Sequence, residues 1–190
     1  LEMKKILAFN GSPNVKGNTA LLLETMLKAA ASKGAETKLV SLNSLKMKGC
    51  QACYACQGNG GHCATVDELQ PLLEEIYKAD TIILGSPVYM GQMSAQLKGL
   101  VDRFFSFLNM AAGHKTNLAS GKKAVMLFVQ NMPTPEAFSS YFEETRQVVE
   151  SIGFEVAELM VAPGLGGPGA VREKPELLAK AEEIGKKIAQ

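Results

Sequence analysis

Residues 5–19 read KILAFNGSPNVKGNT, and this stretch decides the fold class of the chain. Residues 5–10 form a short, mostly apolar run that predicts a β-strand. The Gly-Ser-Pro tripeptide at 11–13 ends that run, and a helical pattern begins near Thr19. The stretch therefore predicts a strand, a loop and a helix in direct succession.

The same succession recurs along the whole chain. Strands and helices are predicted in turn at 5–10, 19–33, 37–42, 69–77, 81–85, 97–108, 124–129, 138–152, 156–161 and 177–188. Strict alternation predicts right-handed crossovers and an open parallel sheet with helices on both faces. We therefore expect an α/β fold, a three-layer α/β/α sandwich whose five parallel strands run in the order 2-1-3-4-5.

Length and composition fit one domain. The chain has 190 residues, 46% of them hydrophobic, which is enough to bury a core between two helix layers. We expect a single domain over residues 3–190, with residues 1–2 a vector-derived remnant ahead of Met3.

Charge and hydropathy exclude several classes of partner. The formal net charge is +1, so no long-range field would attract nucleic acid or an anionic membrane. No apolar run approaches the roughly 20 residues that span a bilayer, and the start lacks the pattern of a signal peptide. We expect a cytoplasmic protein that binds neither nucleic acid nor membrane.

The loop at 11–19 has the composition of a phosphate-binding loop. It leads into a helix start, where free N–H groups and the positive end of the helix dipole favour an anion. Ser12, Asn18 and Thr19 could add donors, and Lys16 could screen charge. The alternative is a plain turn in which Asn18 or Thr19 caps the helix. Neither a Walker loop nor a dinucleotide fingerprint is present here, which disfavours nucleoside triphosphates.

A Gly-x-Gly-x-x-Gly pattern occurs later, at Gly164, Gly166 and Gly169. Pro168 and the delayed helix remove the context that a dinucleotide fingerprint needs, and too little chain follows for its ribose-binding carboxylate. We expect this segment to be a mobile loop over the site, with a plain linker as the alternative.

The segment at 85–94, after the third predicted strand, mixes turn residues with apolar and aromatic ones. A flat heteroaromatic ring could lie there, with backbone groups reaching its polar edge. The alternative is that the side chains of Tyr89 and Met90 only pack over the end of the sheet and have no role in binding.

Together these loops resemble those of the NADPH-dependent FMN reductase and iron–sulfur flavoprotein families. Gly-Ser-Pro and Gly-Asn-Thr follow the first strand, and Ser-Pro-Val-Tyr-x-Gly-x-x-Ser-Ala-Gln-Leu-Lys begins at Ser86. The resemblance covers residues 4–107 and implies a flavodoxin-like fold, bound FMN, and electron exchange with NAD(P)H or a ferredoxin-type donor. It implies that the FMN site is formed by Ser12, Pro13, Lys16, Gly17, Asn18, Thr19, Pro87, Val88, Tyr89, Met90 and Gly91.

The four cysteines form one compact motif, Cys50-x2-Cys53-x2-Cys56-x6-Cys63. This spacing lets four thiolates converge on one iron–sulfur cluster. It also matches the cysteine motif of iron–sulfur flavoproteins, which implies a [4Fe–4S] cluster that passes electrons to FMN. Structural zinc, a redox disulfide and free thiols are the alternatives. His62 is expected to be a solvated loop residue rather than a ligand.

Residues 102–108 are predicted to have structural roles rather than roles in ligand binding. Phe104, Phe105 and Leu108 continue the sheet-facing stripe, whereas Phe107 falls off it. We expect Phe107 to be a subunit contact in a homodimer or homotetramer. The Asp102–Arg103 dipeptide is expected to form a charge pair at the helix end.

The sequence thus predicts an FMN-dependent oxidoreductase that transfers electrons from NAD(P)H to an acceptor. No protein acid or base is assigned as catalytic, because the chemistry takes place on the flavin. The first alternative is an iron–sulfur flavoprotein that carries electrons from a ferredoxin through a cluster on the four cysteines. The second is a non-catalytic binding module stapled by zinc.

Overall fold

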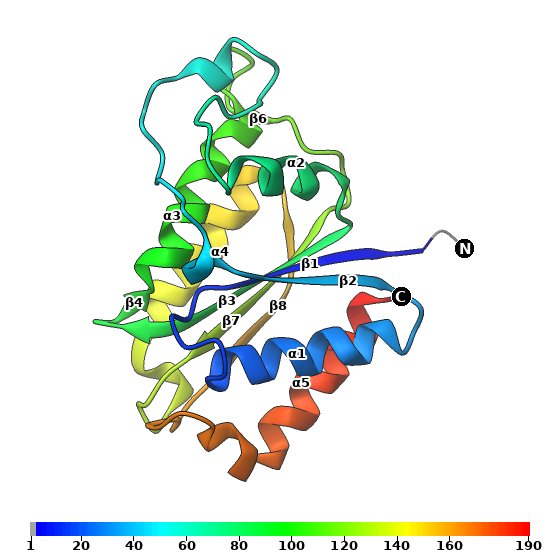
Figure 1. The fold of residues 1–190 in the computed structure, drawn as a ribbon, viewed down its shortest axis with the longest axis vertical. Coiled ribbons are helices and arrows are strands. Elements are labelled where there is room, and N and C mark those ends of the chain that lie inside the picture. The colour runs from blue at the N-terminus through cyan, green and yellow to red at the C-terminus, as the bar shows by residue number, and fades with distance from the viewer. Residues whose placement is uncertain (1–2) are drawn as a thin grey trace.

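Five parallel strands form the central sheet of this computed structural model, which describes residues 3–190 (Figure 1). In chain order they are β1 (Lys5–Asn10), β2 (Glu36–Ser41), β3 (Thr81–Tyr89), β7 (Lys123–Val129) and β8 (Glu155–Ala162). Their spatial order is β2-β1-β3-β7-β8. Counted along the chain this is 2-1-3-4-5, so the predicted topology is confirmed. The predicted remnant at residues 1–2 lies outside the described residues.

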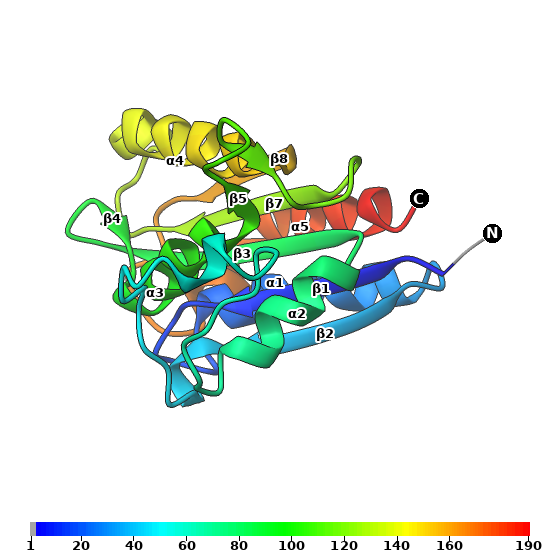
Figure 2. The ribbon, with the colours of Figure 1, turned by 90° about the horizontal axis from the view of Figure 1, so that it is seen from above.

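Helices cover both faces of the sheet, as the alternating pattern predicts (Figure 2). One face carries α1 (Asn18–Ala31) and α5 (Pro175–Ile188), and the other carries α2 (Gln70–Lys78), α3 (Ala95–Arg103) and α4 (Ser139–Ile152). Side chains of β1 alternate between the two cores: Ile6 and Ala8 pack with α1 and α5, whereas Leu7 and Phe9 pack with the other three helices. The flavodoxin-like sandwich is therefore confirmed.

Burial explains why the central strands have nearly continuous apolar sequences. Residues 81–86 of β3 and 124–129 of β7 are buried throughout, because helices cover a parallel sheet on both sides. In the edge strand β2, by contrast, Glu36 and Lys38 are exposed and the other four residues are buried or half-buried. In the described part of the chain, residues 3–190, no helix has the length and apolar character that crossing a membrane requires.

Short elements connect these layers. They are the strands β4 (Gln92–Met93), β5 (Leu108–Asn109) and β6 (Lys115–Thr116), and the 3-10 helices η1 (Leu42–Ser44), η2 (Ala55–Gln57), η3 (Phe104–Phe107), η4 (Pro135–Phe138) and η5 (Ala170–Glu173).

One of them, η3, overturns the prediction that Phe107 is a subunit contact. Phe107 is 0% exposed and lies in the core with Phe104, at a ring separation of 5.3 Å. The α-helix ends at Arg103, and residues 104–107 continue as a 3-10 helix, in which positions i and i+3 share a face. Phe104 and Phe107 therefore point the same way, and Phe105 is left half-buried against Tyr54.

Candidate functional site

A cavity of about 310 Å³ opens at the carboxyl ends of β1, β3 and β7. The loop after β1 contributes Ser12, Asn14, Gly17, Asn18 and Thr19 to its lining. Pro87, Val88 and Tyr89 come from the end of β3, and residues 129–131 and 165–168 complete the wall. Strand order reverses between β1 and β3, which is where ligands bind in open parallel sheets.

The N-terminus of α1 is open toward this cavity. Gly17 is the N-cap residue, and no side chain among the described residues caps the helix. The alternative in which Asn18 or Thr19 caps it is therefore wrong. The N–H groups of residues 18–20 belong to the first turn, which has no intrahelical acceptor for them. They supply the donors and the positive dipole end that an anion requires.

The loop before α1 is held in shape by its own side chains. The Ser12 N–H donates to Asn10 Oδ1 at 3.0 Å, and the Asn14 N–H donates to Ser12 Oγ at 3.1 Å. Asn14 Oδ1 accepts from the Lys16 N–H at 3.1 Å. These side-chain turns preform the loop, and the Ser12 hydroxyl keeps its own hydrogen for a ligand.

Asn18 has a role that its place in the loop did not indicate. Its Nδ2 donates to the Gly167 carbonyl at 2.8 Å, and its Oδ1 accepts from the Val171 N–H at 3.0 Å. The amide therefore binds the glycine-rich segment at one end and η5, which directly follows it, at the other. The segment also donates from the N–H groups of Gly164 and Leu165 to backbone carbonyls near β7. The segment does line the cavity, as expected, and these hydrogen bonds fasten it to α1.

Replacing Asn18 with alanine is expected to lower the free energy of unfolding by about 1–2 kcal/mol, because two backbone groups lose their partner. Urea denaturation measures the loss. The matched control is Asn131→Ala, since Asn131 lines the same cavity but is exposed. We expect its effect to stay within about 0.5 kcal/mol. Equal losses in the two variants would contradict the assignment.

The segment at 85–94 is a β-hairpin rather than the expected loop. β3 runs to Tyr89, and β4 pairs back onto it, with Tyr89 opposite Gln92. Met90 and Gly91 form the turn with φ angles of 49° and 81°, the left-handed values of a type I′ hairpin. The hairpin was not predicted, because the apolar run stops at Gly85 and so indicates a strand that ends there.

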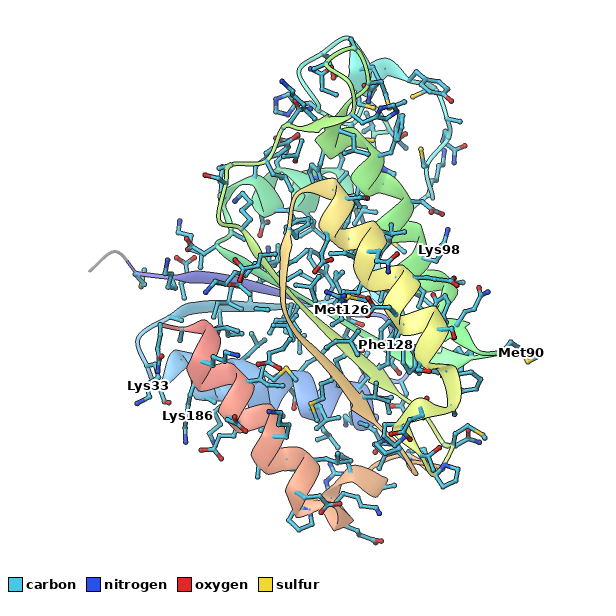
Figure 3. The ribbon with its side chains drawn as sticks, turned by 180° about the vertical axis from the view of Figure 1, so that it is seen from behind. Lys33, Met90, Lys98, Met126, Phe128 and Lys186 are labelled. Carbon is cyan, nitrogen blue, oxygen red and sulfur yellow. The ribbon has the colours of Figure 1, made fainter. Side chains whose placement is uncertain are left out.

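The hairpin presents Tyr89 and Met90 differently. Tyr89 lines the cavity and is 49% exposed, whereas Met90 is 101% exposed at the tip (Figure 3). The alternative that both plug the end of the sheet is therefore wrong. Met90 and Gly91, like Pro13 and Lys16 in the first loop, do not line the cavity.

Two serines join the hairpin to the first loop. Ser94 Oγ donates to the Gly11 carbonyl at 2.7 Å and accepts from the Leu97 N–H at 3.2 Å, so Ser94 caps α3. The Ser94 N–H donates to Ser86 Oγ at 2.8 Å. These bonds hold the two loops at a fixed separation across the cavity.

Gln130, which follows β7, was not singled out from the sequence. It lines the cavity, is 2% exposed and donates from Nε2 to the Thr134 carbonyl at 2.6 Å. Within residues 3–190, its Oε1 has no hydrogen-bond partner. A buried acceptor without a donor is costly, and a ligand N–H or O–H would satisfy it. Together with the open helix end and the exposed ring of Tyr89, the cavity fits a phosphorylated aromatic ligand that carries donors.

The four cysteines gather around a second, smaller cavity. Cys50, Cys53, Cys56 and Cys63 all line a space of about 20 Å³ beside Arg103. None of the four is in a disulfide. Over the described residues, no three His, Cys, Asp or Glu side chains converge on a single ion. The donor set of four sulfurs still suits a thiophilic group larger than one ion.

The cysteine segment lies far from the first cavity. Figure 1 shows it in cyan at the top, whereas the loop before α1 and the orange glycine-rich segment lie in the lower half. His62, within this segment, is exposed and lies 2.8 Å from Glu74, as expected for a solvated residue. Burial, and next the charge of Glu74, raises the pKa of Tyr77 to about 12, and its hydroxyl donates to the Gly61 carbonyl.

The expected Asp102–Arg103 pair is wrong. Asp102 pairs instead with Lys98, one helical turn earlier, at 2.6 Å. Arg103 is buried and pairs with Asp67 at 2.9 Å. Adjacent helical residues point about 100° apart, so neighbours in sequence meet different partners.

Comparison with known proteins agrees with this geometry. The profile of the family described as NADPH-dependent FMN reductase matches residues 4–157. An iron–sulfur flavoprotein of Methanocaldococcus jannaschii is 43% identical over 99 residues, 52% of this chain and 51% of that protein. One from Archaeoglobus fulgidus is 29% identical over 187 residues, 98% of this chain and 79% of that protein. In several such matches the chain spans only about half of the relative's length.

Solved structures share the fold. An NAD(P)H:quinone oxidoreductase from Methanothermobacter marburgensis superposes with a TM-score of 0.75 at 18% identity, covering 98% of this chain and 100% of that one. An FMN-dependent NADH-azoreductase from Bacillus anthracis, in complex with FMN, gives 0.73 at 14% identity with the same coverage.

Proposed function

Since this chain belongs to the NADPH-dependent FMN reductase family, we propose that it is an NAD(P)H-dependent FMN oxidoreductase. It binds FMN in the cavity at the carboxyl ends of β1, β3 and β7, and electrons pass from NAD(P)H through the flavin to an acceptor. The observation that carries this proposal is the uncapped N-terminus of α1 facing that cavity.

Each group that lines the cavity has a proposed task. The N–H groups of residues 18–20 and the Ser12 hydroxyl hold the phosphate. Pro87, Val88 and Tyr89 flank the isoalloxazine ring, and Gln130 Oε1 accepts from a donor of the ligand. Pro13, Lys16, Met90 and Gly91 remain predicted contacts of the ligand-bound protein.

When bound, FMN supplies hydride acceptance and transfer of one or two electrons. The residues of this chain bind and orient it. The helix end fixes the phosphate, the hairpin fixes the plane of the ring, and Asn18 holds the glycine-rich segment as the far wall. Because Tyr89 is half exposed, one side of the cavity stays open to a second substrate.

Titration under anoxic conditions tests the proposal. FMN fluorescence should be quenched on binding, and NADPH or NADH should then bleach the absorbance of the bound flavin. Riboflavin, which has no phosphate, should bind more weakly. Unchanged FMN fluorescence would refute the flavin site, whereas bound but unbleached flavin would refute only the nicotinamide donor.

A second candidate function is favoured by the cysteine cavity. All four cysteines face one space, and relatives that align with half of this chain are named iron–sulfur flavoproteins. We propose that these cysteines hold a [4Fe–4S] cluster that exchanges electrons with a ferredoxin-type donor. Anoxic purification followed by assay of iron and acid-labile sulfide tests this. Stoichiometric zinc without flavin would instead indicate the zinc-stapled binding module.

The assembly proposed from the sequence is a homodimer or homotetramer of a single-domain chain. Phe107 no longer supports it. Exposed apolar side chains near the flavin cavity now do, namely Val15, Tyr89, Met90 and Met132. Light scattering during size-exclusion chromatography should give a mass of two or four chains, and a monomer would refute the proposal.

A further inference from the structure

We propose that Arg103 is the positioning residue of the cysteine site. It joins the two ends of the cysteine loop and donates a hydrogen bond to Cys63. This hydrogen bond raises the reduction potential of a cluster held by the four cysteines. The inference rests on the second candidate function, the cluster on the four cysteines.

Arg103 binds both flanks of the cysteine segment. Its Nη1 donates to the Lys48 carbonyl at 3.0 Å, before the first cysteine. Its Nη2 donates to the Thr65 carbonyl at 3.1 Å and its Nη1 to Asp67 Oδ2 at 2.9 Å, after the last cysteine. One side chain at the end of α3 therefore closes the loop from Lys48 to Asp67.

The same guanidinium also touches a sulfur. Arg103 Nε donates to Cys63 Sγ at 3.1 Å, a close approach for a sulfur acceptor. Loop closure does not require this bond, because the two Nη groups already make the flanking contacts. The planar guanidinium, with its five N–H donors, can bind the two backbone carbonyls, Asp67 and Cys63 at the same time. A lysine ammonium at this position could not.

The environment makes this hydrogen bond strong. The Arg103 side chain is 0% exposed and that of Asp67 is 6% exposed, so water does not compete for the donors. Among the other sulfurs, Cys56 Sγ accepts from the neutral Gln57 amide, at 3.6 Å, and has no other donor within residues 3–190. Cys63 is thus a cysteine whose sulfur accepts a hydrogen bond from a positively charged side chain.

A positively charged hydrogen-bond donor at a ligand sulfur changes the reduction potential of a cluster. Reduction adds negative charge that is shared by the sulfur ligands, and a hydrogen bond to a ligand sulfur stabilises the reduced state more than the oxidised state. Asp67 balances the charge of Arg103 but leaves its Nε–H directed at Cys63. The bond therefore raises the reduction potential.

The test compares Arg103→Lys with the wild-type chain after anoxic reconstitution with ferrous iron and sulfide. Arg146→Lys is the matched control, since Arg146 makes its ion pairs on the exposed surface of α4. In molecules that carry a complete cluster, we expect Arg103→Lys to lower the reduced-to-oxidised ratio about tenfold at a fixed potential. For a one-electron couple this is about 59 mV. Arg146→Lys should change nothing.

The outcomes separate the inference from its premise. If Arg103→Lys loses cluster content but the loaded fraction keeps the wild-type potential, Arg103 is only structural and the inference is overturned. If the wild-type chain takes up no iron and sulfide, the cluster itself is refuted, and the inference with it. The FMN titration is independent of both results.

A measurement on the unaltered chain covers the case in which Arg103→Lys does not fold. The chain has only three arginines, Arg103, Arg146 and Arg172, so labelling arginine with ¹⁵N marks few sites. Pulsed electron paramagnetic resonance of the reduced cluster should detect a ¹⁵N coupling through the Nε–H···S bond. Absence of that coupling would overturn the inference.

Discussion

Replacing Asp67 with alanine is expected to lower the free energy of unfolding by about 3–5 kcal/mol, because it leaves the buried guanidinium of Arg103 without a counter-charge. The two groups lie 2.9 Å apart and are almost fully shielded from water. Asp67 also accepts from the N–H of Lys48, at 2.8 Å, so alanine would free a loop residue as well. Urea denaturation followed by circular dichroism measures the loss.

The chain offers a matched control in Asp102→Ala. Asp102 also forms an ion pair, with Lys98 at 2.6 Å, but both partners are exposed. Exposed pairs contribute less than about 1 kcal/mol, so this variant should remain close to wild type. Equal losses for Asp67→Ala and Asp102→Ala would show that burial of the pair is not what matters.

The Asp67–Arg103 pair should make the free energy of unfolding depend on pH. Burial works to raise the pKa of Asp67, but the hydrogen bond from Arg103 and the backbone N–H of Lys48 outweigh it, so the pKa lies below its usual value. A carboxyl whose folded-state pKa is lowered contributes stability above the unfolded-state pKa of about 4, and loses it as pH falls through the folded-state value. The stability gap between wild type and Asp67→Asn should therefore be full at pH 7 and shrink below about pH 4.

Replacing Asn14 with aspartate is expected to weaken FMN binding roughly 10- to 100-fold, if FMN occupies the proposed site. Asn14 is exposed, lines the cavity and lies beside the N-terminus of α1. Aspartate has nearly the same shape and keeps the acceptor for the Lys16 N–H. It adds a charge that repels the phosphate dianion by about 1–3 kcal/mol at a separation of several ångströms. Fluorescence titration measures the change.

Two controls isolate the charge. Asn43→Asp makes the same chemical change at η1, where Asn43 accepts from Gln96 outside the cavity, and should bind FMN normally. Riboflavin lacks the phosphate, so its affinity should be equal for wild type and Asn14→Asp. An equal loss of riboflavin affinity would mean that the substitution disturbs the loop rather than repelling phosphate.

Much of the fold follows from short-range patterns. β1 occupies residues 5–10 as predicted, because a buried strand between polar turns leaves a clear apolar run. The stripe at helical spacing likewise placed α5 to within two residues of its observed start at Pro175. Parallel order then follows from alternation, since each helix must return the chain to the same end of the sheet.

What the sequence did not reveal about Asn18 and Arg103 depends on partners distant in sequence. Asn18 was predicted as a phosphate donor, and its further role, an amide that binds residues 149 and 153 positions away, was not foreseen. Arg103 was paired with its neighbour, yet it binds Asp67, 36 positions earlier. Phe107 was misplaced for a local reason, because the change from α to 3-10 geometry leaves no mark in the apolar pattern.

The wall at residues 165–168 lies beyond residues 4–157, the part that the family profile matches. Because it is rich in glycine, at 164, 166, 167 and 169, that wall is formed mostly by main chain. Asn18 of α1 binds the Gly167 carbonyl within it and the Val171 N–H just after it. Insertions or deletions in it would therefore change the far wall of the cavity while leaving the loop between β1 and α1 in place. In this chain the shape of that wall and the anion-binding helix end are therefore set by two separate segments.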